Sequence, residues 1–384
     1  MSLDDFLEHT LQILDRASLR RKLRTLSGPL APTILVDGKE VLCLCSNNYL
    51  GLASHPRLSQ ALKEGVELYG AGSGASRLVS GNFELHDMLE HTLADFVGLE
   101  SSLVFSSGFA ANSGIISAIY SSKDVIFSDE LNHASIIDGC RLSGAKIYKY
   151  QHKNINDING LLESHRSEGK KALIVSDAVF SMDGDLAPVS ELHELARRYD
   201  AALMIDEAHA LGVIGPQGRG LCKKEGIRPE ILVGTFGKSF GLSGAFVAGD
   251  KKLKEFLINR ARSFIYSTAI PQFAAHALLQ ATELVMQADT LRDELSKRCV
   301  QLREGLSKLG LDVKAGSTPI IPILIGSSAK TMALSEALLE KGVFVQGIRP
   351  PTVPAGTARL RLVPMATHSE AEIERALSIF SQIL

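Results

Sequence analysis

From about residue 100 onward, short apolar segments alternate with longer amphipathic ones. The short segments are 103–105, 125–128, 146–150, 172–177, 202–206, 231–235 and 245–248. Several of them are apolar at consecutive positions, which is typical of strands that are buried on both faces of a sheet. Their alternation with helical segments predicts an α/β domain built on a mainly parallel sheet.

Polar side chains stand where three of these predicted strands end. Asp177, Asp206 and Thr235 occupy those positions, and His209 and Lys238 each follow a strand end closely. Parallel strands end at the same edge of a sheet, and ligands of such sheets bind there. The common placement therefore predicts a functional site at the carboxyl edge.

The pairing of Asp206 with Lys238 favours one cofactor, pyridoxal 5′-phosphate (PLP). A lysine amine forms a Schiff base with the PLP aldehyde, and a carboxylate keeps the pyridine nitrogen protonated, so that the ring can accept electrons. Two neighbouring strands that end in this pair of groups would meet both needs. The sequence therefore predicts a PLP enzyme.

Two other ligands are less compatible with these residues. A phosphate-binding loop around Gly237-Lys238-Ser239 requires a glycine at position 232, which is Leu232. A metal held by an aspartate and a nearby histidine requires a third ligand, and none stands at suitable spacing. We therefore expect no metal.

The segment Ser106-Ser107-Gly108-Phe109-Ala110 follows a predicted strand and opens a helix. The first turn of a helix has free N–H groups and the positive end of the helix dipole, which suit a phosphate group. An ordinary N-cap serine is the alternative interpretation. His133 has two interpretations as well, a structural histidine or a ring that stacks on a planar cofactor.

The length of 384 residues allows one large and one smaller domain. We expect an N-terminal segment at 1–48, a large cofactor-binding α/β domain at 49–287, and an α+β domain at 288–384. The first segment is predicted to hold a helix to about residue 25 and a hairpin of strands 33–36 and 40–45. The last is predicted to follow a long helix at 274–309, with strands at 320–325, 343–345 and 358–363 and a final helix.

Composition excludes several partners. The formal net charge of −2 gives no reason to expect nucleic acid or an anionic membrane, and no apolar run approaches the roughly 18 residues of a membrane span. The five cysteines are an odd number without metal spacing, which predicts reduced thiols in a cytoplasmic protein. The acidic N-terminus does not resemble a signal peptide.

Several motifs occur in order along the chain. They are Ser46-Asn47-Asn48-Tyr49-Leu50-Gly51-Leu52, Gly108-Phe109-Ala110-Ala111-Asn112, Asn132-His133-Ala134-Ser135, Val179-Phe180-Ser181-Met182-Asp183-Gly184, Asp206-Glu207-Ala208-His209, Thr235-Phe236-Gly237-Lys238 and Arg359-Leu360-Arg361. With them the chain resembles the α-oxoamine synthases, fold-type I PLP-dependent transferases that join an amino acid to an acyl-CoA. Glu207 departs from the pattern, since many relatives have a second aspartate there; we expect its side chain to face away from the ring.

The resemblance implies a role for each matching residue around the cofactor. Lys238 would hold PLP and move the Cα proton, Asp206 would pair with the pyridine nitrogen, and His133 would stack on the ring. Further cofactor contacts are implied for His209 and Ser181 at the ring oxygen, for Gly108, Phe109 and Thr235 at the phosphate, and for Ser267 and Thr268 at the phosphate of the neighbouring subunit. The family forms homodimers with shared active sites. Lys238, His133, Asp206 and His209 are thus the expected catalytic residues.

The resemblance also implies substrate contacts. Asn47 and Arg361 would hold the amino-acid carboxylate beside His133, and Arg21 and Thr352 would contact the acyl substrate, with Arg20 or Arg24 as alternatives to Arg21. The tail Ile348-Arg349-Pro350-Pro351-Thr352-Val353-Pro354 is similar to members that condense L-alanine with pimeloyl-CoA, or a pimeloyl-carrier protein, in biotin biosynthesis.

Other activities remain as alternatives. Glycine with acetyl-CoA is the alternative substrate pair within the family, and transamination is another PLP reaction on the same fold. A non-enzymatic binding protein would be expected to have lost part of the site, whereas the four expected catalytic residues are all present.

Overall fold

The structure is a computed structural model that describes residues 1–384. The chain divides into two compact units. The first contains residues 1–51, 182–184 and 290–384, and the second contains residues 52–181 and 185–289. The sequence predicts a separate segment at 1–48, whereas in the structure these residues belong to the same unit as the C-terminal residues.

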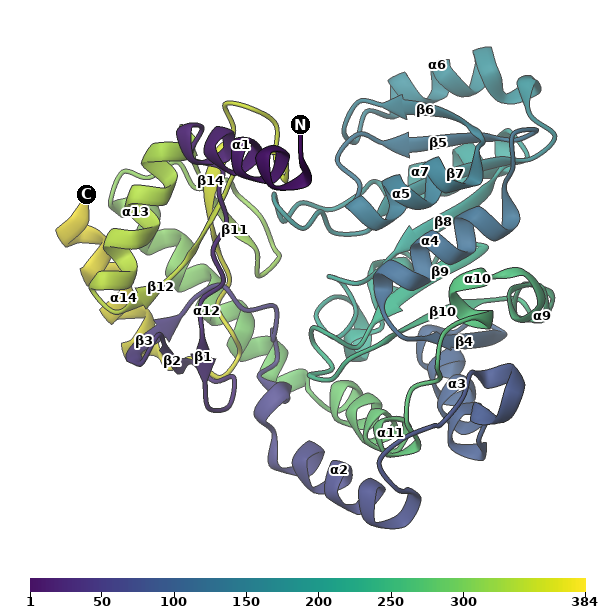
Figure 1. The fold of residues 1–384 in the computed structure, drawn as a ribbon, viewed down its shortest axis with the longest axis horizontal. Helices are drawn as coiled ribbons and strands as arrows, with labels where there is room; N and C mark the ends of the chain where they lie inside the picture. The colour runs from purple at the N-terminus through teal and green to yellow at the C-terminus, as the bar shows by residue number, and fades with distance from the viewer. The chain divides into compact units, whose positions relative to one another are not determined.

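The second unit is built on a seven-stranded sheet in the order β4-β10-β9-β8-β7-β5-β6 (Figure 1). The strands are β4 (Ser101–Phe105), β5 (Val125–Asp129), β6 (Lys146–Tyr150), β7 (Ala172–Asp177), β8 (Ala202–Asp206), β9 (Ile231–Thr235) and β10 (Ala245–Gly249). Only β10 runs antiparallel to its neighbours, so the prediction of a mainly parallel sheet is confirmed.

Helices separate these strands along the chain and pack on the sheet. The longer ones are α2 (Pro56–Tyr69), α3 (Glu84–Val97), α4 (Gly108–Ile119), α5 (Ala134–Ser143), α6 (Ile155–His165), α7 (Val189–Arg198), α9 (Lys251–Arg260) and α11 (Gln272–Met286). Short ones are α8 (Leu221–Glu225), α10 (Arg262–Ile265), a π-helical turn at Arg77–Gly81, and 3-10 turns at Leu52–Ser54, Arg166–Glu168 and Pro216–Gly218. Side chains of α4, α5 and α10 pack with those of the strands in one buried apolar cluster, which holds the strand ends in place.

The first unit contains two small sheets. One has the order β1-β2-β3-β12, from β1 (Leu26–Ser27), β2 (Thr33–Val36), β3 (Lys39–Cys43) and β12 (Val343–Phe344), and includes the predicted hairpin around Asp37 and Gly38. The other has the order β11-β14-β13, from β11 (Ile321–Gly326), β13 (Gln346–Ile348) and β14 (Ala358–Leu362). The pairing of β3 with β12 joins the N-terminal and C-terminal residues in this unit.

Four helices complete the first unit: α1 (Leu3–Arg16), α12 (Asp289–Lys308), α13 (Ser328–Glu340) and α14 (Glu370–Ile383). The prediction of one helix over 274–309 is wrong. The backbone leaves helical geometry after Met286, where the Gln287 N–H closes the turn on Glu283 and Val285, and a new helix begins at Asp289 with an acidic first turn. The predicted first helix is likewise too long, because Ala17 ends it.

Candidate active site at the carboxyl edge

Asp206 is the last residue of β8, and its buried carboxylate is held from two sides. Asn112 of α4 donates its Nδ2 to Oδ2 at 2.7 Å, and the backbone N–H of Ala208 donates to Oδ1 at 2.9 Å. The side chain is only 5% exposed. Since a carboxylate oxygen can accept more than one hydrogen bond, the group keeps capacity for a cationic partner in a fixed direction.

Asn112 connects Asp206 to His133, although it is not among the residues expected at the site. Its Nδ2 also donates to Ser135 Oγ at 2.9 Å, and that hydroxyl lies 2.7 Å from Nδ1 of His133. The signal in the sequence was helical spacing: Asn112 stands four residues after Gly108, so it lies on the same face one turn inside the helix. A chain of hydrogen bonds therefore links two of the expected catalytic residues.

His133 is the N-cap of α5, and its ring stays accessible to solvent. Partial desolvation lowers the pKa of its imidazole, against the attraction of the Asp206 carboxylate. The neutral form is therefore favoured at pH 7, and a neutral imidazole can stack on an aromatic ring without placing a second cation beside a protonated pyridine nitrogen.

Asp177 ends β7 directly beside Asp206 in the parallel register. Its Oδ2 accepts the backbone N–H of His133 at 2.7 Å, and its own backbone N–H donates to Asn132 at 2.9 Å. Burial, and then the neighbouring charge of Asp206, raise the pKa of the Asp177 carboxyl well above its ordinary value. We infer that Asp177 fixes the backbone at His133, whereas the Asp206 carboxyl group is the one left available to a ligand at this edge.

Lys238 lies in a tight turn that follows β9. Thr235 Oγ1 accepts the Gly237 N–H at 3.3 Å and donates to the Gly244 carbonyl at 3.1 Å, and the Gly241 N–H donates to the Lys238 carbonyl at 3.0 Å. Gly241 has a φ of +72°, and a Cβ there would lie 2.5 Å from backbone atoms of residues 52 and 53. No other residue type fits without strain, so the lysine backbone is held in one conformation.

The N-terminus of α4 offers an anion site. Ser107 caps the helix by accepting the Ala110 N–H at 3.1 Å, whereas the N–H groups of Gly108 and Phe109 have no acceptor within the helix. A Cβ added at Gly108 would meet nothing within 4 Å, so the space beside this first turn is open. A phosphate group fits both observations.

The remaining expected cofactor contacts lie in loops of the same unit. His209 is buried in the turn after β8, Ser181 lies in the turn after β7, and Ser267 and Thr268 follow α10, where Thr268 forms a bridge with Ser76. Glu207, fully buried, accepts the backbone N–H groups of Leu221 and Cys222 at 2.8 and 2.6 Å.

His152 supports the neighbouring loops from outside the site. Its Nδ1 lies 3.0 Å from Asp129 Oδ1, at the end of β5, and its Nε2 lies 2.9 Å from Asp185 Oδ2. Against the cost of burial, the hydrogen bonds to these two carboxylates raise the pKa of His152 to about 9. A protonated imidazole therefore joins β5 to the segment that follows Ser181.

The chemical groups at this edge match the parts of PLP that need to be bound. A buried carboxylate is available for the pyridine nitrogen, a lysine for the aldehyde, an imidazole for the ring face, and a helix N-terminus for the phosphate. They come from elements that the chain separates widely, such as Asn112 and Asp206, which are 94 residues apart. No group of three or more His, Cys, Asp or Glu side chains is placed to hold a metal ion.

The first unit brings together the residues expected to bind substrate. Arg361 of β14 donates Nη2 to Asn47 Oδ1 at 3.0 Å. Arg21 donates Nη2 to Thr352 Oγ1 at 3.2 Å. Each expected pair is thus adjacent in space although its members lie 314 and 331 residues apart in the chain.

The structure distinguishes Arg21 from the two alternative arginines. Arg20 pairs with Asp15 at 2.6 Å, and Arg24 pairs with Asp37 at 3.2 Å and with Glu336. Both guanidinium groups are therefore already engaged by carboxylates, whereas the Arg21 guanidinium donates to the neutral hydroxyl of Thr352. This arrangement favours Arg21 for an anionic ligand.

Comparison with known proteins identifies the family of the chain. Residues 39–380 match the family described as aminotransferase class I and II. The 8-amino-7-oxononanoate synthase of Geobacter metallireducens is 49% identical over 97% of this chain and 96% of its own. The protein of that name from Symbiobacterium thermophilum is 44% identical over 100% of this chain and 98% of its own.

Solved structures resemble the whole fold. Serine palmitoyltransferase from S. paucimobilis, with a bound PLP–myriocin aldimine, has a TM-score of 0.93 and 30% identity, covering 99% of this chain and 96% of its own. An 8-amino-7-oxononanoate synthase from Francisella tularensis has a TM-score of 0.77 and 30% identity, covering 89% and 97%. The α-oxoamine synthase resemblance, the fold class and the PLP prediction are confirmed.

Proposed function

Because the chain belongs to the aminotransferase class I and II family, we infer that it catalyses a PLP-dependent acyl transfer, the decarboxylative condensation of L-alanine with a pimeloyl thioester to 8-amino-7-oxononanoate in biotin biosynthesis. The observation that carries this inference is the Asp206 carboxylate, held by Asn112 at the strand end beside the one that leads to Lys238. The near full-length identity to synthases of that name supports the choice of reaction.

When bound, PLP supplies an electron sink for the negative charge that develops at the substrate Cα. Asp206 would hold a proton on the pyridine nitrogen, and Asn112 keeps the Asp206 carboxylate in place. Lys238 takes the proton from Cα of the amino acid and returns one to the product. The first turn of α4 would bind the phosphate through its free N–H groups and so would hold the cofactor in place.

We propose that the Arg361–Asn47 pair binds the amino-acid carboxylate. Arginine presents a planar fork of donors that matches a carboxylate, and the Asn47 amide oxygen orients one arm of that fork. The neutral His133 ring would add an apolar face against the substrate methyl group. In the same way we propose that Arg21 and Thr352 bind the acyl substrate, since a pimeloyl chain ends in a free carboxylate.

A substrate comparison tests the proposed reaction. We expect CoA release from L-alanine with pimeloyl-CoA, and at least about 10²-fold less from glycine with acetyl-CoA, because an anionic acyl terminus adds a charged contact worth a few kcal/mol. Preference for glycine and acetyl-CoA would instead indicate a glycine C-acetyltransferase. Replacing pimeloyl-CoA by the pimeloyl-carrier protein shows which acyl donor is preferred.

Two matched variants test the acyl contact. Arg21→Ala should raise the KM for pimeloyl-CoA about 10-fold with little change in kcat, because it removes a contact made equally before and during the reaction. Arg20→Ala, which only loses a surface ion pair with Asp15, should leave both parameters nearly unchanged. Equal effects of the two variants would contradict the assignment.

We also propose a homodimer in which Ser267 and Thr268 contact the partner's cofactor phosphate, as in the family that the chain resembles. All five cysteines are free thiols, which supports a cytoplasmic location. No helix combines the length and the apolarity that crossing a membrane requires.

A further inference from the structure

The hairpin that carries Ser181 belongs to the second unit, but its tip belongs to the first. The hairpin follows β7 and is closed by the Phe180 N–H, which donates to the Asp185 carbonyl at 3.0 Å. Ser181 and Asp185 are part of the second unit, whereas residues 182–184 are part of the first. The three residues that directly follow the expected contact of the PLP ring oxygen are therefore held by the first unit.

Asp183, in this tip, forms a buried ion pair with Arg359 of β14. Arg359 Nη1 lies 2.6 Å from Asp183 Oδ1, and the two side chains are only 8% and 13% exposed. Arg359 Nε also donates to the Thr357 carbonyl at 3.0 Å, so the guanidinium is oriented by its own segment of the chain. Lys314 is a second, more exposed partner, since its ammonium lies 3.3 Å from the same oxygen and its side chain is 62% exposed.

Gly184, the last residue of the tip, packs closely against the first unit. Its carbonyl accepts the hydroxyl of the buried Thr318 at 2.5 Å. Gly184 has a φ of +71°, and a Cβ added there would lie 2.5 Å from the Ile320 carbonyl oxygen, so only glycine fits without strain. The tip is therefore fixed at two consecutive residues.

The strand that holds Asp183 also carries Arg361, which is proposed to bind the amino-acid carboxylate. Leu360 and Leu362 lie in the apolar core of the first unit. Side chains alternate along a strand, so Arg359 and Arg361 lie together on the opposite face, roughly 7 Å apart along β14. One face of β14 therefore holds both the hairpin tip and the proposed carboxylate contact.

We propose that Arg359 is a positioning residue for the cofactor. Through Asp183 it holds the hairpin in the conformation that places the Ser181 hydroxyl on the ring oxygen of PLP, so the proposal rests on the PLP binding that the proposed function requires. An ion pair with hydrogen-bond geometry fixes a direction, whereas apolar contacts at the tip would not.

Equilibrium dialysis of the PLP-loaded protein tests the proposal without any substrate. The main variant combines Asp183→Asn with Arg359→Met, which removes the ion pair and leaves no unpaired buried charge. We expect its dissociation constant for PLP to be at least about 5-fold higher than that of the unaltered protein, the factor that corresponds to one lost hydrogen bond.

The pH dependence of the absorbance of bound PLP is the second measurement. A donor at the ring oxygen stabilises the form in which the adjacent Schiff-base nitrogen has lost its proton, because the oxygen then carries an uncompensated negative charge. Loss of the Ser181 contact should therefore raise the pH midpoint in the double variant by about half a unit or more. A defect in stability alone would not move this midpoint.

Three further variants locate the effect. Lys314→Gln is the matched control, because it removes the exposed partner of the same carboxylate, and both measurements should stay close to those of the unaltered protein. Arg359→Met alone leaves Asp183 beside Lys314 and should show the same changes as the double variant. Ser181→Ala should show them too, and adding it to the double variant should change little further, since both act on the same contact.

Three results would overturn the proposal. One is a double variant with the PLP affinity and pH midpoint of the unaltered protein, since the ion pair would then only neutralise two buried charges. Another is an unchanged pH midpoint in Ser181→Ala, and the third is full additivity of Ser181→Ala with the double variant. Neither measurement requires turnover, so a failure of the proposed acyl transfer would leave these outcomes readable.

Discussion

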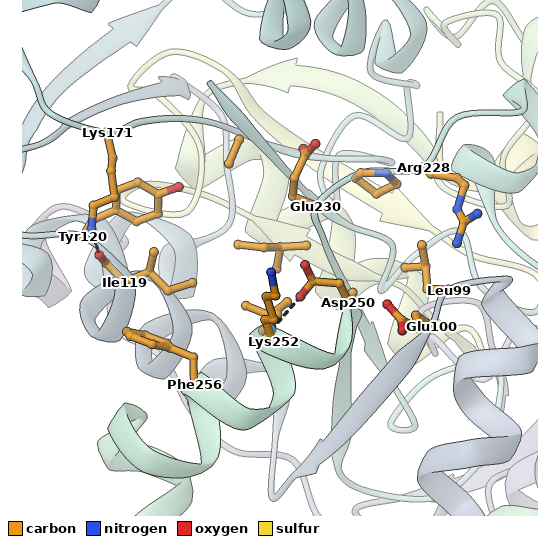
Figure 2. A pocket seen from close by; sticks show the side chains of 15 residues that line it. Leu99, Glu100, Ile119, Tyr120, Lys171, Arg228, Glu230, Asp250, Lys252 and Phe256 are labelled. Atoms are coloured by element: carbon orange, nitrogen blue, oxygen red, sulfur yellow. Dashed lines mark hydrogen bonds between the residues drawn. The ribbon is translucent and has the colours of Figure 1, made fainter. Parts of the chain in front are cut away.

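The two edges of the seven-stranded sheet differ in how their polar groups are partnered. At the carboxyl edge, Asp206, Asn112 and His133 are linked through protein hydrogen bonds. At the amino edge, Arg228 and Tyr120 line a cavity of about 590 Å³ and belong to no such hydrogen-bonded set (Figure 2). Groups that hold one another are positioned before a ligand arrives, which catalysis requires.

The difference also predicts unequal sensitivity to substitution. Removing one member of a buried hydrogen-bonded set leaves its partners unsatisfied, which costs about 1–3 kcal/mol for each group. Removing a group that belongs to no such set leaves nothing unsatisfied. Substitutions at the carboxyl edge should therefore affect both stability and turnover, and substitutions at the amino edge should affect neither strongly.

The largest effect is expected at Asp206. Asp206→Ala removes the charge that stabilises the protonated pyridine nitrogen, and kcat should fall about 10³-fold or more. Steady-state CoA release measures the loss, and the absorbance of bound PLP shows whether the cofactor is still held. A variant that retains PLP and turns over at the normal rate would contradict the role of Asp206.

A smaller effect is expected at Asn112, which acts through Asp206. Asn112→Ala should lower kcat about 10-fold by loosening the carboxylate, and Asn112→Asp should lower it further because a second negative charge would face the first. The pH profile of kcat should shift in both variants, which a purely structural defect would not cause.

Asn259→Ala is the matched control for the two Asn112 variants. Asn259 lies on α9 and donates only to the Glu255 carbonyl within its own helix. We expect normal kcat and an unchanged pH profile. If Asn259→Ala and Asn112→Ala behaved alike, the hydrogen bond between Asn112 and Asp206 would have no special importance.

The smallest effect concerns His152, which stabilises the carboxyl edge through charge. Its pKa in the folded protein is raised to about 9 from an ordinary value of 6.5, so its contribution is fully present below about pH 6.5 and is lost as the pH rises through 9. Between pH 6 and pH 10 the thermal midpoint of the unaltered protein should therefore fall by about 2–4 °C more than that of His152→Gln.

His165→Gln provides the comparison for this pH effect. His165 pairs with Glu168 at a surface position of α6. At pH 6 we expect His165→Gln to lose much less stability than His152→Gln, because the pair of His165 with Glu168 lies at the surface and is screened by solvent. If the thermal midpoint of His152→Gln equalled that of the unaltered protein at every pH, the pairs of His152 with Asp129 and Asp185 would contribute nothing to stability.

Local features of the chain predicted much of the fold. The apolar runs that end at Asp177, Asp206 and Thr235 are strands with those same last residues, because burial on both faces of a sheet demands consecutive apolar side chains. The break at residues 287–288 was not foreseen, because the amphipathic pattern continues through it and only backbone geometry shows the two helices.

The placement of the expected catalytic residues at one edge was readable from the sequence, because the order of strand, turn and helix brings their backbones there. The partners of those residues were not readable. Asn112 reaches Asp206 across 94 residues, Arg21 rather than Arg20 or Arg24 reaches Thr352, and Arg359 reaches Asp183 across 176 residues. Sequence alone determined the chemical groups and the edge on which they lie, since short-range periodicity sets secondary structure. Only the tertiary structure decided which groups are held and by which partners, and where a cavity remains at the amino edge, since these depend on packing between segments distant in the chain.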